Sequence, residues 1–376
     1  MQLAIDLAKK GQWKTSPNPC VGAVIVKNDK IIGRGYHKKA GTPHAEVNAI
    51  ADAGDLAAGA TIYVTLEPCN HTGRTPPCTQ AILKAGITRV VVGMADPNPS
   101  VKGNGSSFLL SRGLQVETGV LEEECTKLNH PFIKHSTTGL PWVVMKAGMS
   151  LDGKITYRKG HGGKITGKEA GLFTHKLRNS LDAILVGIGT AIIDNPSLTT
   201  RLPDEEHGRD PVRVILDTHL RFPEKKKMLR QKSTAPTWIF CGPDAAYATE
   251  QRLIDEGAVI HRVGLDADNK LAIREVLQNL GKSNINSVLV EGGAAVHGAM
   301  LHRKFVDEVF LFIAPFFIGQ SGIPLLDGFE CDDVAKKTYL DQIEVQQLGN
   351  DTLIHGYLGQ YYHSVPCLVR NEHETV

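Results

Sequence analysis

The chain has 376 residues, of which 41% are hydrophobic and 22% charged, and its formal net charge is +2. At roughly 150 residues per domain, this length predicts two domains that each bury their own core. The near-neutral charge gives no reason to expect binding to nucleic acid or to a membrane surface, and no apolar run reaches the roughly 18 residues of a membrane span.

The amino terminus and the cysteines favour a cytoplasmic protein. Residues 1–7 hold no basic region ahead of an apolar core, so we expect no signal peptide. The seven cysteines are an odd number scattered over a long chain, which is typical of a reducing compartment. Two belong to the motif described below, and we expect the others to be ordinary core or surface residues: Cys20, Cys125, Cys241, Cys331 and Cys367.

Helical and extended patterns alternate along the first third of the chain. Apolar runs on either side of the turn pair Asn28-Asp29 predict a hairpin. The expected helices cover residues 2–10, 44–53, 78–85 and 105–112, and the expected strands cover 21–27, 30–36, 61–66, 89–94 and 115–118. This alternation predicts a largely parallel sheet with helices on its faces.

Four residues in this region form a zinc motif: His44, Glu46, Cys69 and Cys78. One neutral imidazole and two thiolates leave a zinc ion with one open coordination position, as in catalytic zinc sites. Zinc lowers the pKa of a bound water to about 7, and Glu46 would carry protons from that water to a ring nitrogen and to the leaving ammonia. We therefore expect three metal ligands and one catalytic carboxylate in a hydrolytic deaminase.

The two cysteines of the motif are separated by residues 70–77, whose glycine and prolines predict a loop. Both halves of the motif open predicted helices, and helix N-termini favour thiolates. Two other interpretations stay open at this point. His71 in the loop could close the fourth position of a structural zinc site, or the motif residues could be unrelated.

A second alternation begins after the polar stretch 136–141. We place the boundary there and expect domains at 1–139 and 140–360, followed by a loose tail at 361–376. The expected strands cover residues 142–146, 183–187, 212–216, 237–241, 287–291 and 306–313, and the expected helices cover 168–180, 271–280 and 294–303. Residues 343–348 and 352–357 predict a closing antiparallel hairpin.

Two glycine turns mark this second region, Gly187-x-Gly189 and Gly292-Gly293. Each follows a predicted strand. Glycines in such a turn let the backbone approach a ligand, and a helix N-terminus after the turn favours a phosphate. Neither turn has the three-glycine spacing of the dinucleotide-binding fingerprint. From these residues alone each turn is a weak signal, and a plain strand-to-helix turn is the favoured interpretation.

Several longer segments resemble the bifunctional deaminase/reductase family of riboflavin biosynthesis. They are residues 15–24, 41–49, 65–78 and 96–99 for the deaminase part, and 146–155, 186–201 and 289–293 for the reductase part. The resemblance implies an α/β chain with an N-terminal cytidine-deaminase-like three-layer domain. It also implies a C-terminal dihydrofolate-reductase-like domain, whose mixed sheet has an antiparallel edge.

The resemblance implies two reactions and two cofactors. The first is zinc-dependent hydrolytic deamination of 2,5-diamino-6-(5-phosphoribosylamino)pyrimidin-4-one. The second is NADPH reduction of the ribosyl group of 5-amino-6-(5-phosphoribosylamino)uracil to ribityl.

The resemblance assigns substrate contacts in the first domain. Asn18 and His37 match positions that hold the pyrimidine, and Arg74 matches a basic position near the substrate phosphate. An arginine in a loop beside the metal is a sensible phosphate clamp. A solvated loop charge and a plain surface histidine are the alternatives for Arg74 and His37.

In the second domain, Lys146, Asp194 and Glu291 are candidates for orienting the ribose and moving the proton. Glu291 is expected to bind substrate as well, and Arg178 and Arg201 match positions near the substrate phosphate. The implied NADPH contacts are Ala147, Lys164, Thr190, Asp194, Leu198, Gly292 and Gly293.

One stretch departs from the family pattern, which has a serine two residues before Trp-Ile-Thr. Here Gly162 stands in place of the serine and Lys164 in place of the tryptophan. A polar substrate contact and an aromatic cofactor contact are therefore missing. Lys164 could pair with the 2′-phosphate of the cofactor, or the change could signal a weakened reductase.

Two alternatives for the whole chain follow. The C-terminal domain could be non-catalytic or weakened, or the chain could be a nucleic-acid-editing zinc deaminase. The second alternative predicts a basic surface and salt-dependent binding, and near-neutral charge with 6% aromatic residues gives it little support. We expect a small phosphorylated pyrimidine as the partner, no nucleic acid or membrane, and a homo-oligomer, either a dimer or a tetramer.

Overall fold

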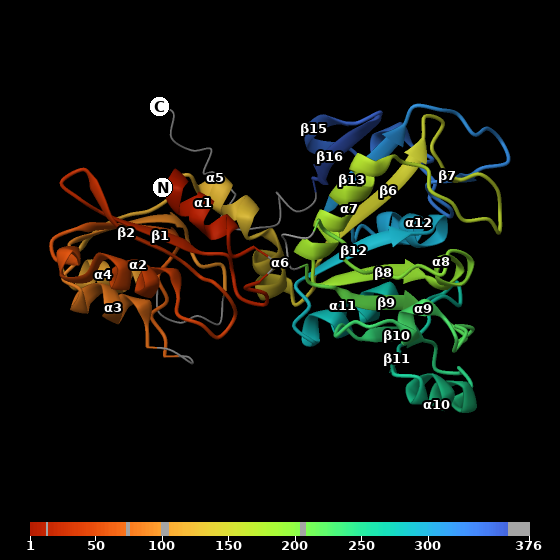
Figure 1. Cartoon of the computed structure of the whole chain (residues 1–376), viewed down its shortest axis with the longest axis horizontal. Coiled ribbons are helices and arrows are strands. Elements are labelled where there is room, and N and C mark those ends of the chain that lie inside the picture. Colours follow the sequence, from red (N-terminus) through yellow and green to blue (C-terminus); the bar gives the residue numbers. More distant parts are fainter. Residues whose placement is uncertain (13, 73–75, 99–104, 204–207, 360–376) are drawn as a thin grey trace. The chain divides into compact units, whose positions relative to one another are not determined.

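The computed structural model describes residues 1–12, 14–72, 76–98, 105–203 and 208–359. They fall into two compact units, Met1–Leu140 and Pro141–Val376 (Figure 1). We call these the N-terminal and the C-terminal unit and describe each by itself. The predicted tail at 361–376 lies outside the described residues. None of the helices in the described ranges is long and apolar enough to cross a membrane.

The N-terminal unit is built on a mixed sheet. Its described strands lie in the order β2-β1-β3-β4-β5. Their bounds are β1 Gly22–Lys27, β2 Lys30–Tyr36, β3 Thr61–Leu66, β4 Arg89–Met94 and β5 Gln115–Glu117. The prediction of a largely parallel sheet is wrong for the pairing of β1 with β3, which is antiparallel. The predicted hairpin of β1 and β2 is confirmed. The short turn at Asn28-Asp29 can only join antiparallel strands.

Helices cover both faces of this sheet, giving three layers (Figure 1). Their bounds are α1 Gln2–Lys9, α2 Ala45–Ala53, α3 Cys78–Lys84, α4 Gly105–Ser111, α5 Glu122–Leu128 and α6 His130–Thr138, with a short 3-10 turn at Gly54–Ala57. The helices α5 and α6 were not predicted from the sequence. The expected polar linker at 136–141 begins inside α6, because Ser136, Thr137 and Thr138 bond back to carbonyls of their own helix.

Glycines let α2 lie directly against the sheet. A Cβ on Gly35 of β2 would lie 2.3 Å from the Ala45 carbonyl oxygen, and one on Gly33 would lie 2.4 Å from that of Ala49. Both distances are far shorter than a real Cβ contact, so only glycine fits. This close approach fixes the first turn of α2, which carries His44 and Glu46 of the zinc motif.

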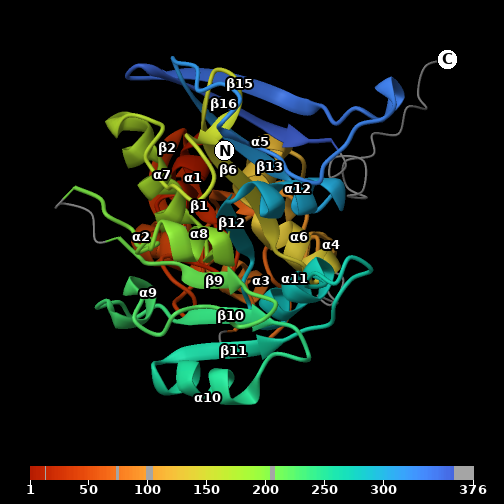
Figure 2. The ribbon, with the colours of Figure 1, turned by 90° about the vertical axis from the view of Figure 1, so that its right-hand side faces the viewer.

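The C-terminal unit has a larger mixed sheet. Its described strands run β11-β10-β9-β8-β12-β6-β13-β16-β15, from the lower to the upper end of the sheet in Figure 2. Their bounds are β6 Trp142–Ser150, β8 Ala183–Gly187, β9 Val212–Leu216, β10 Thr237–Cys241, β11 Ala258–Arg262, β12 Ser287–Gly292, β13 Glu308–Ala314, β15 Leu340–Leu348 and β16 Asp351–Leu358. Pairing is parallel from β11 to β13 and antiparallel at β16 and β15.

This arrangement confirms the mixed sheet with an antiparallel C-terminal edge. The helices are α7 Lys168–Ser180, α8 Ile188–Ile193, α9 Lys227–Arg230, α10 Tyr247–Asp255, α11 Ile273–Lys282 and α12 Ala294–His302, with a 3-10 turn at Val334–Lys336. A separate short sheet pairs β7 Lys154–Thr156 with β14 Ile323–Pro324. The sequence patterns missed β7, β11, β14, α8, α9 and α10, which are short or lie on the solvent side.

The central parallel strands place the polar residues of this unit. β12 pairs with β6 on one side and β8 on the other, and the three are buried along most of their length. Apolar residues fill such strands because both faces are covered. Their carboxyl ends meet at one edge, where ligands bind in open α/β sheets.

The tight fit of α2 on β2 generates a prediction. We expect Gly35→Ala to lower the free energy of unfolding of the N-terminal unit by about 1–3 kcal/mol, because the added Cβ must push α2 away. Zinc retention should fall as well, since α2 positions one ligand. Urea unfolding and zinc content measure both effects. Arg34→Ala, an exposed neighbour on β2, should change neither, and normal zinc content in Gly35→Ala would refute the argument.

Candidate active sites

Three side chains of the zinc motif meet in the N-terminal unit. The Nδ1 atom of His44 and the Sγ atoms of Cys69 and Cys78 all lie within 4.8 Å of one another. His44 Nδ1 is 3.2 Å from Cys78 Sγ and 3.6 Å from Cys69 Sγ. Tetrahedral zinc with ordinary Zn–N and Zn–S bond lengths separates such donors by about 3.6 Å. The residues present therefore fit a zinc ion.

Each ligand comes from the start of a helix or the end of a strand. His44 caps the N-terminus of α2, Cys78 is the first residue of α3, and Cys69 follows β3. The hydrogen bond from Cys78 and the neighbouring His44 lower the pKa of the Cys69 thiol to about 4. At neutral pH the cluster thus already holds one thiolate, the form that binds metals.

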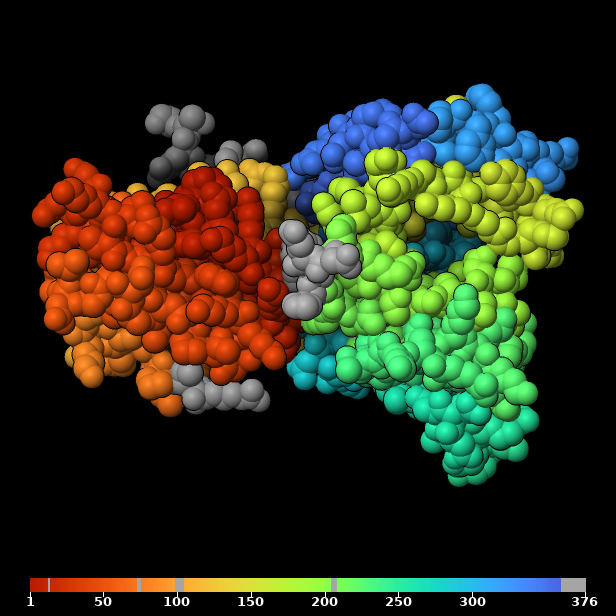
Figure 3. All heavy atoms as spheres, in the orientation of Figure 1, coloured from red at the N-terminus to blue at the C-terminus, as the bar shows by residue number. Residues whose placement is uncertain are grey.

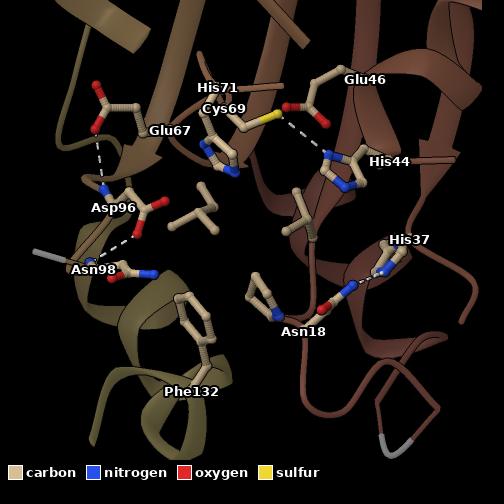
Figure 4. Close-up of a pocket in the computed structure, with 13 residues that line it drawn as sticks. Asn18, His37, His44, Glu46, Glu67, Cys69, His71, Asp96, Asn98 and Phe132 are labelled. Carbon is tan, nitrogen blue, oxygen red and sulfur yellow. Dashed lines mark hydrogen bonds between the residues drawn. The ribbon is translucent and has the colours of Figure 1, made fainter. Parts of the chain in front are cut away.

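His71 does not complete the cluster. Among the residues that the structure describes, the metal-ligating group holds only the three predicted ligands. His71 lines the neighbouring pocket instead (Figure 4). The interpretation as a closed structural site is therefore disfavoured.

Glu46 lies in the first turn of α2 and is 3% exposed. Burial raises its pKa to about 7, helped by the charge on Cys69. A carboxyl group with a pKa near neutrality can both take and give a proton at physiological pH. Figure 4 shows it beside His44 and Cys69 at the edge of the pocket.

The pocket beside this cluster has a volume of about 230 Å³. On one side, Asn18 Nδ2 lies 3.2 Å from His37 Nε2, and His37 Nδ1 lies 3.2 Å from the Pro43 carbonyl oxygen. His37 is only 3% exposed, so it is not the plain surface histidine considered above. Both predicted pyrimidine contacts therefore line the same pocket as the zinc ligands.

The opposite wall is polar and was not assigned from the sequence. Glu67 accepts hydrogen bonds from the backbone N–H groups of Asp96 and Ser106 at 3.2 and 2.9 Å. Asp96 accepts one from the Asn98 N–H at 2.9 Å, and burial raises the Asp96 pKa. Phe132 of α6 adds an apolar surface (Figure 4). Segments 65–78 and 96–99 carried the signal for the acids, but nothing in the pattern marked Phe132. Arg74 lies outside the described residues.

The C-terminal unit contains a larger pocket of about 640 Å³. Figure 3 shows a hollow there, where yellow-green atoms that follow β7 overhang teal atoms from the region of β12. All but one of the predicted reductase residues line this pocket: Lys146, Ala147, Lys164, Arg178, Thr190, Asp194, Leu198, Glu291, Gly292 and Gly293. Arg201 is the exception: its exposed side chain donates to Thr199 Oγ1, and the charges of Arg178 and Glu291 still influence its pKa.

A buried ion cluster forms the centre of this pocket. Arg178 donates from Nε and Nη2 to the two carboxylate oxygens of Glu291, at 2.6 and 2.7 Å, and Lys146 Nζ lies 4.0 Å from the same carboxylate. Burial alone would raise the pKa of Glu291, but the two cations outweigh it and hold the pKa at about 2. Burial lowers the pKa of Lys146, and Glu291 opposes that change.

The glycine turn after β12 fits a dinucleotide. Gly292 has φ of 145°, and a Cβ on Gly293 would lie 3.3 Å from Thr190 Oγ1 at the first turn of α8. Because the two glycines have no side chains, the turn leaves space at the mouth of the pocket. This space lies between the N-termini of α8 and α12, which favour anions. Asp194 at the end of α8 also faces the pocket, and burial raises its pKa. Glycine turn, helix N-termini and pocket size together are compatible with NADPH.

Family profiles match both parts of the chain. Residues 1–94 match the "Cytidine and deoxycytidylate deaminase zinc-binding region", and residues 141–354 match the "RibD C-terminal domain". Among curated relatives, the "Riboflavin biosynthesis protein RibD" of Bacillus amyloliquefaciens is 44% identical, over 93% of this chain and 93% of its own. The protein of the same name from Escherichia coli strain K12 is 38% identical, over 94% of this chain and 97% of its own.

Solved structures of RibD proteins are also similar to this chain over nearly its full length. "Acinetobacter baumannii RibD, form 1" superposes with a TM-score of 0.85 at 38% identity and covers 96% of this chain and 98% of its own. A Thermotoga maritima protein, titled diaminohydroxyphosphoribosylaminopyrimidine deaminase/5-amino-6-(5-phosphoribosylamino)uracil reductase, superposes with a TM-score of 0.82. It is 38% identical and covers 95% of this chain and 97% of its own.

The ion cluster generates a pH prediction. Glu291 has a folded-state pKa of about 2, below the ordinary 4.5, so its stabilising effect is complete above about pH 4.5 and is lost as the pH falls toward about 2. Glu291→Gln should lower the free energy of unfolding at pH 7 by about 3–5 kcal/mol, because two buried cations lose their partner. This deficit should shrink below pH 4.5.

Urea unfolding of wild type and Glu291→Gln between pH 3 and 7 measures the deficit. Asp332→Asn removes a carboxylate whose side chain is 79% exposed and serves as the control. A deficit that does not change with pH would contradict the ion-pair assignment.

Proposed function

Because the chain belongs to the RibD family of riboflavin biosynthesis proteins, we propose that its two units catalyse the two successive reactions of a bifunctional enzyme. The N-terminal unit deaminates 2,5-diamino-6-(5-phosphoribosylamino)pyrimidin-4-one. The C-terminal unit reduces the ribosyl group of 5-amino-6-(5-phosphoribosylamino)uracil to ribityl. The observation that carries the proposal is the three-ligand cluster beside buried Glu46, in a pocket of about 230 Å³ that suits a single base.

Zinc held by His44, Cys69 and Cys78 supplies Lewis-acid activation of the attacking water. Glu46 takes the proton released from that water, passes it to a ring nitrogen and later protonates the leaving amine. Its position at the edge of the pocket and its pKa near 7 suit both directions of transfer.

The pocket walls supply recognition of the pyrimidine. Asn18 and His37 are held together by their own hydrogen bond and present polar atoms to one edge of the ring. The Glu67 and Asp96 wall offers acceptors for the amino groups of the substrate, and Phe132 offers a surface for its ring face. Arg74 keeps its predicted role at the substrate phosphate.

NADPH bound in the C-terminal pocket supplies the hydride that ends on C1′ of the ribosyl group. A proton must reach the ring oxygen as the C1′–O bond breaks, so that the ring opens to ribityl. Glu291 is fixed as an anion by Arg178 and orients the ribose. Lys146 delivers the proton, because burial lowers its pKa and makes its ammonium a better donor. Asp194 lies on the cofactor side.

These features argue against a non-catalytic C-terminal unit. Buried charges are costly to fold, and three of them converge here on one pocket large enough for two ligands. A nucleic-acid editor is not favoured, because the reductase-type C-terminal unit and the full-length RibD relatives fit a two-reaction enzyme. We place the reactions in the cytoplasm, where thiol ligands stay reduced, and we keep a dimer or tetramer as our expectation.

Glu46→Gln tests the deaminase. Its side chain keeps the shape of glutamate but cannot carry a proton, so ammonia release should fall by about 10²- to 10⁴-fold. Zinc content and NADPH oxidation with supplied deaminated intermediate should stay normal. Asp55→Asn, an exposed acid after α2, is the control. Ammonia release at the wild-type rate from Glu46→Gln would refute the proton-carrier role.

Lys146→Gln tests the reductase. Removing the proton donor should lower kcat for NADPH oxidation by about 10²- to 10⁴-fold, while ammonia release stays normal. The Arg178–Glu291 pair does not need Lys146, so the unit should still fold, as circular dichroism can check. If kcat is unchanged, Lys146 is not the proton donor, and the assignment passes to Asp194.

A further inference from the structure

A basic, glycine-rich segment overhangs the pocket of the C-terminal unit. We call residues 157–166 the basic flap. It carries Arg158, Lys159, His161 and Lys164 and no acidic residue. All four side chains belong to exposed residues that line the pocket, and the lysines and the arginine carry positive charge. The flap therefore adds positive charge to a cavity that the proposed function assigns to two phosphorylated ligands.

The flap is fixed at both ends. Before it, β7 pairs with β14, and the Tyr157 ring stacks on Phe316 with ring centroids 6.3 Å apart and planes inclined by 4°. After it, the Gly167 N–H donates to Asp351 Oδ2 at 2.6 Å. Nine residues thus span the pocket between two anchored ends, and this confines their side chains to its mouth.

The middle of the flap approaches the end of α8. A Cβ on Gly162 would lie 1.6 Å from Asp194 Oδ1. A side chain at this position would meet the carboxylate of Asp194, which would have to turn away, whereas glycine needs no such adjustment. Glycine at this position lets the flap backbone lie next to Asp194, on the cofactor side of the pocket.

Lys164 lies at the other side of the flap, against α7. Its Nζ is 3.4 Å from the position of a Cβ on Gly171. Gly171, His175 and Arg178 follow one another at helical spacing on one face of α7, so Lys164 lies on the helix face that leads to the ion cluster. Burial lowers the pKa of His175 to about 4, so Lys164 and Arg178 carry the positive charge on this face. Arg178 itself is occupied by both oxygens of Glu291.

The flap cations have no anion of their own. Across the described ranges, no carboxylate forms an ion pair with Arg158, Lys159, His161 or Lys164. The carboxylates lining the pocket are Asp194, Glu291 and Asp327, and Glu291 is already neutralised by Arg178 and Lys146. Unpaired cations at the mouth of a pocket attract and hold anionic groups.

We propose that the basic flap, through Lys164 above all, binds a phosphate group of a ligand in this pocket. Charge then replaces the serine and tryptophan contacts of the family pattern. The inference rests on the proposed reductase function. The phosphate comes from one of two ligands, the 5-phosphate of the substrate or a phosphate of NADPH.

The test compares Lys164→Gln with Lys164→Arg and with Lys168→Gln. Lys168 is an exposed lysine four residues on, at the start of α7, and it does not line the pocket. The dissociation constants of NADPH and NADH are measured by nicotinamide fluorescence, and the KM of the substrate by NADPH oxidation, each at low and high salt. Lys168→Gln should have the wild-type values of all three constants, and Lys164→Gln should differ from wild type in at least one of them.

We expect Lys164→Gln to weaken one phosphorylated ligand about tenfold, the usual effect of losing one charged hydrogen bond. Lys164→Arg should restore most of that loss, and the salt dependence should be smaller in Lys164→Gln. Weaker NADPH with unchanged NADH identifies the 2′-phosphate, weaker binding of both identifies the pyrophosphate, and a raised substrate KM alone identifies the 5-phosphate.

The proposal is overturned if Lys164→Gln matches Lys168→Gln in all three constants and in salt dependence. The flap charges would then be solvated surface charges only. Failure of the proposed function is distinguishable, because wild type itself would then oxidise no NADPH when deaminated intermediate is supplied. A quadruple replacement of the flap cations by glutamine gives a larger loss if several of them share the phosphate.

Discussion

Each candidate site has an enclosed carboxylate at its centre, and the charges around that carboxylate decide what the neighbouring residues can do. Glu46 is buried beside a thiolate, and its pKa rises to about 7. Glu291 is equally enclosed but lies between two cations, and its pKa falls to about 2. Burial raises the pKa of both carboxylates, and the neighbouring cations reverse the direction of the pKa shift at Glu291. One carboxylate can therefore carry protons, and the other is a permanent anion that positions its surroundings.

The backbone makes both environments possible by bringing strand ends and helix starts together. In the N-terminal unit, Gly33 and Gly35 let α2 touch β2, so that His44 and Glu46 enter the pocket from one helical turn. In the C-terminal unit, the parallel pairing of β6, β12 and β8 aligns Lys146, Glu291 and Gly187 near one edge. Neither site needs a long loop to hold its reacting groups, and positions on strands and helix ends are more precise than positions on loops.

The sequence predicts those parts of the sites whose chemistry depends on residue type and local spacing. The zinc ligands and Glu46 are of this kind, because few other residues could do the same work. Phe132 could not be found, since an apolar residue on an unrecognised helix looks like core. Pairing partners could not be found either: Arg178 is 113 positions from Glu291, and only the folded sheet shows that it binds this carboxylate. Arg201, which resembles a phosphate contact, does not line the pocket with its side chain in this structure, but it lies near enough to Arg178 and Glu291 to feel their charges.

The basic flap illustrates a difference between ligand contacts that need one geometry and ligand contacts that tolerate movement. A hydroxyl and an indole contribute only when their geometry is correct, because a hydrogen bond and a ring contact both lose strength steeply with displacement. Coulomb attraction between a lysine and a phosphate falls off slowly with distance and tolerates a flexible side chain. The proposed phosphate contact of Lys164 is of the second kind, and it lies in the same flap in which Gly162 approaches Asp194. The family's serine and tryptophan are thus one solution to covering this pocket, and a charged segment anchored at both ends is another.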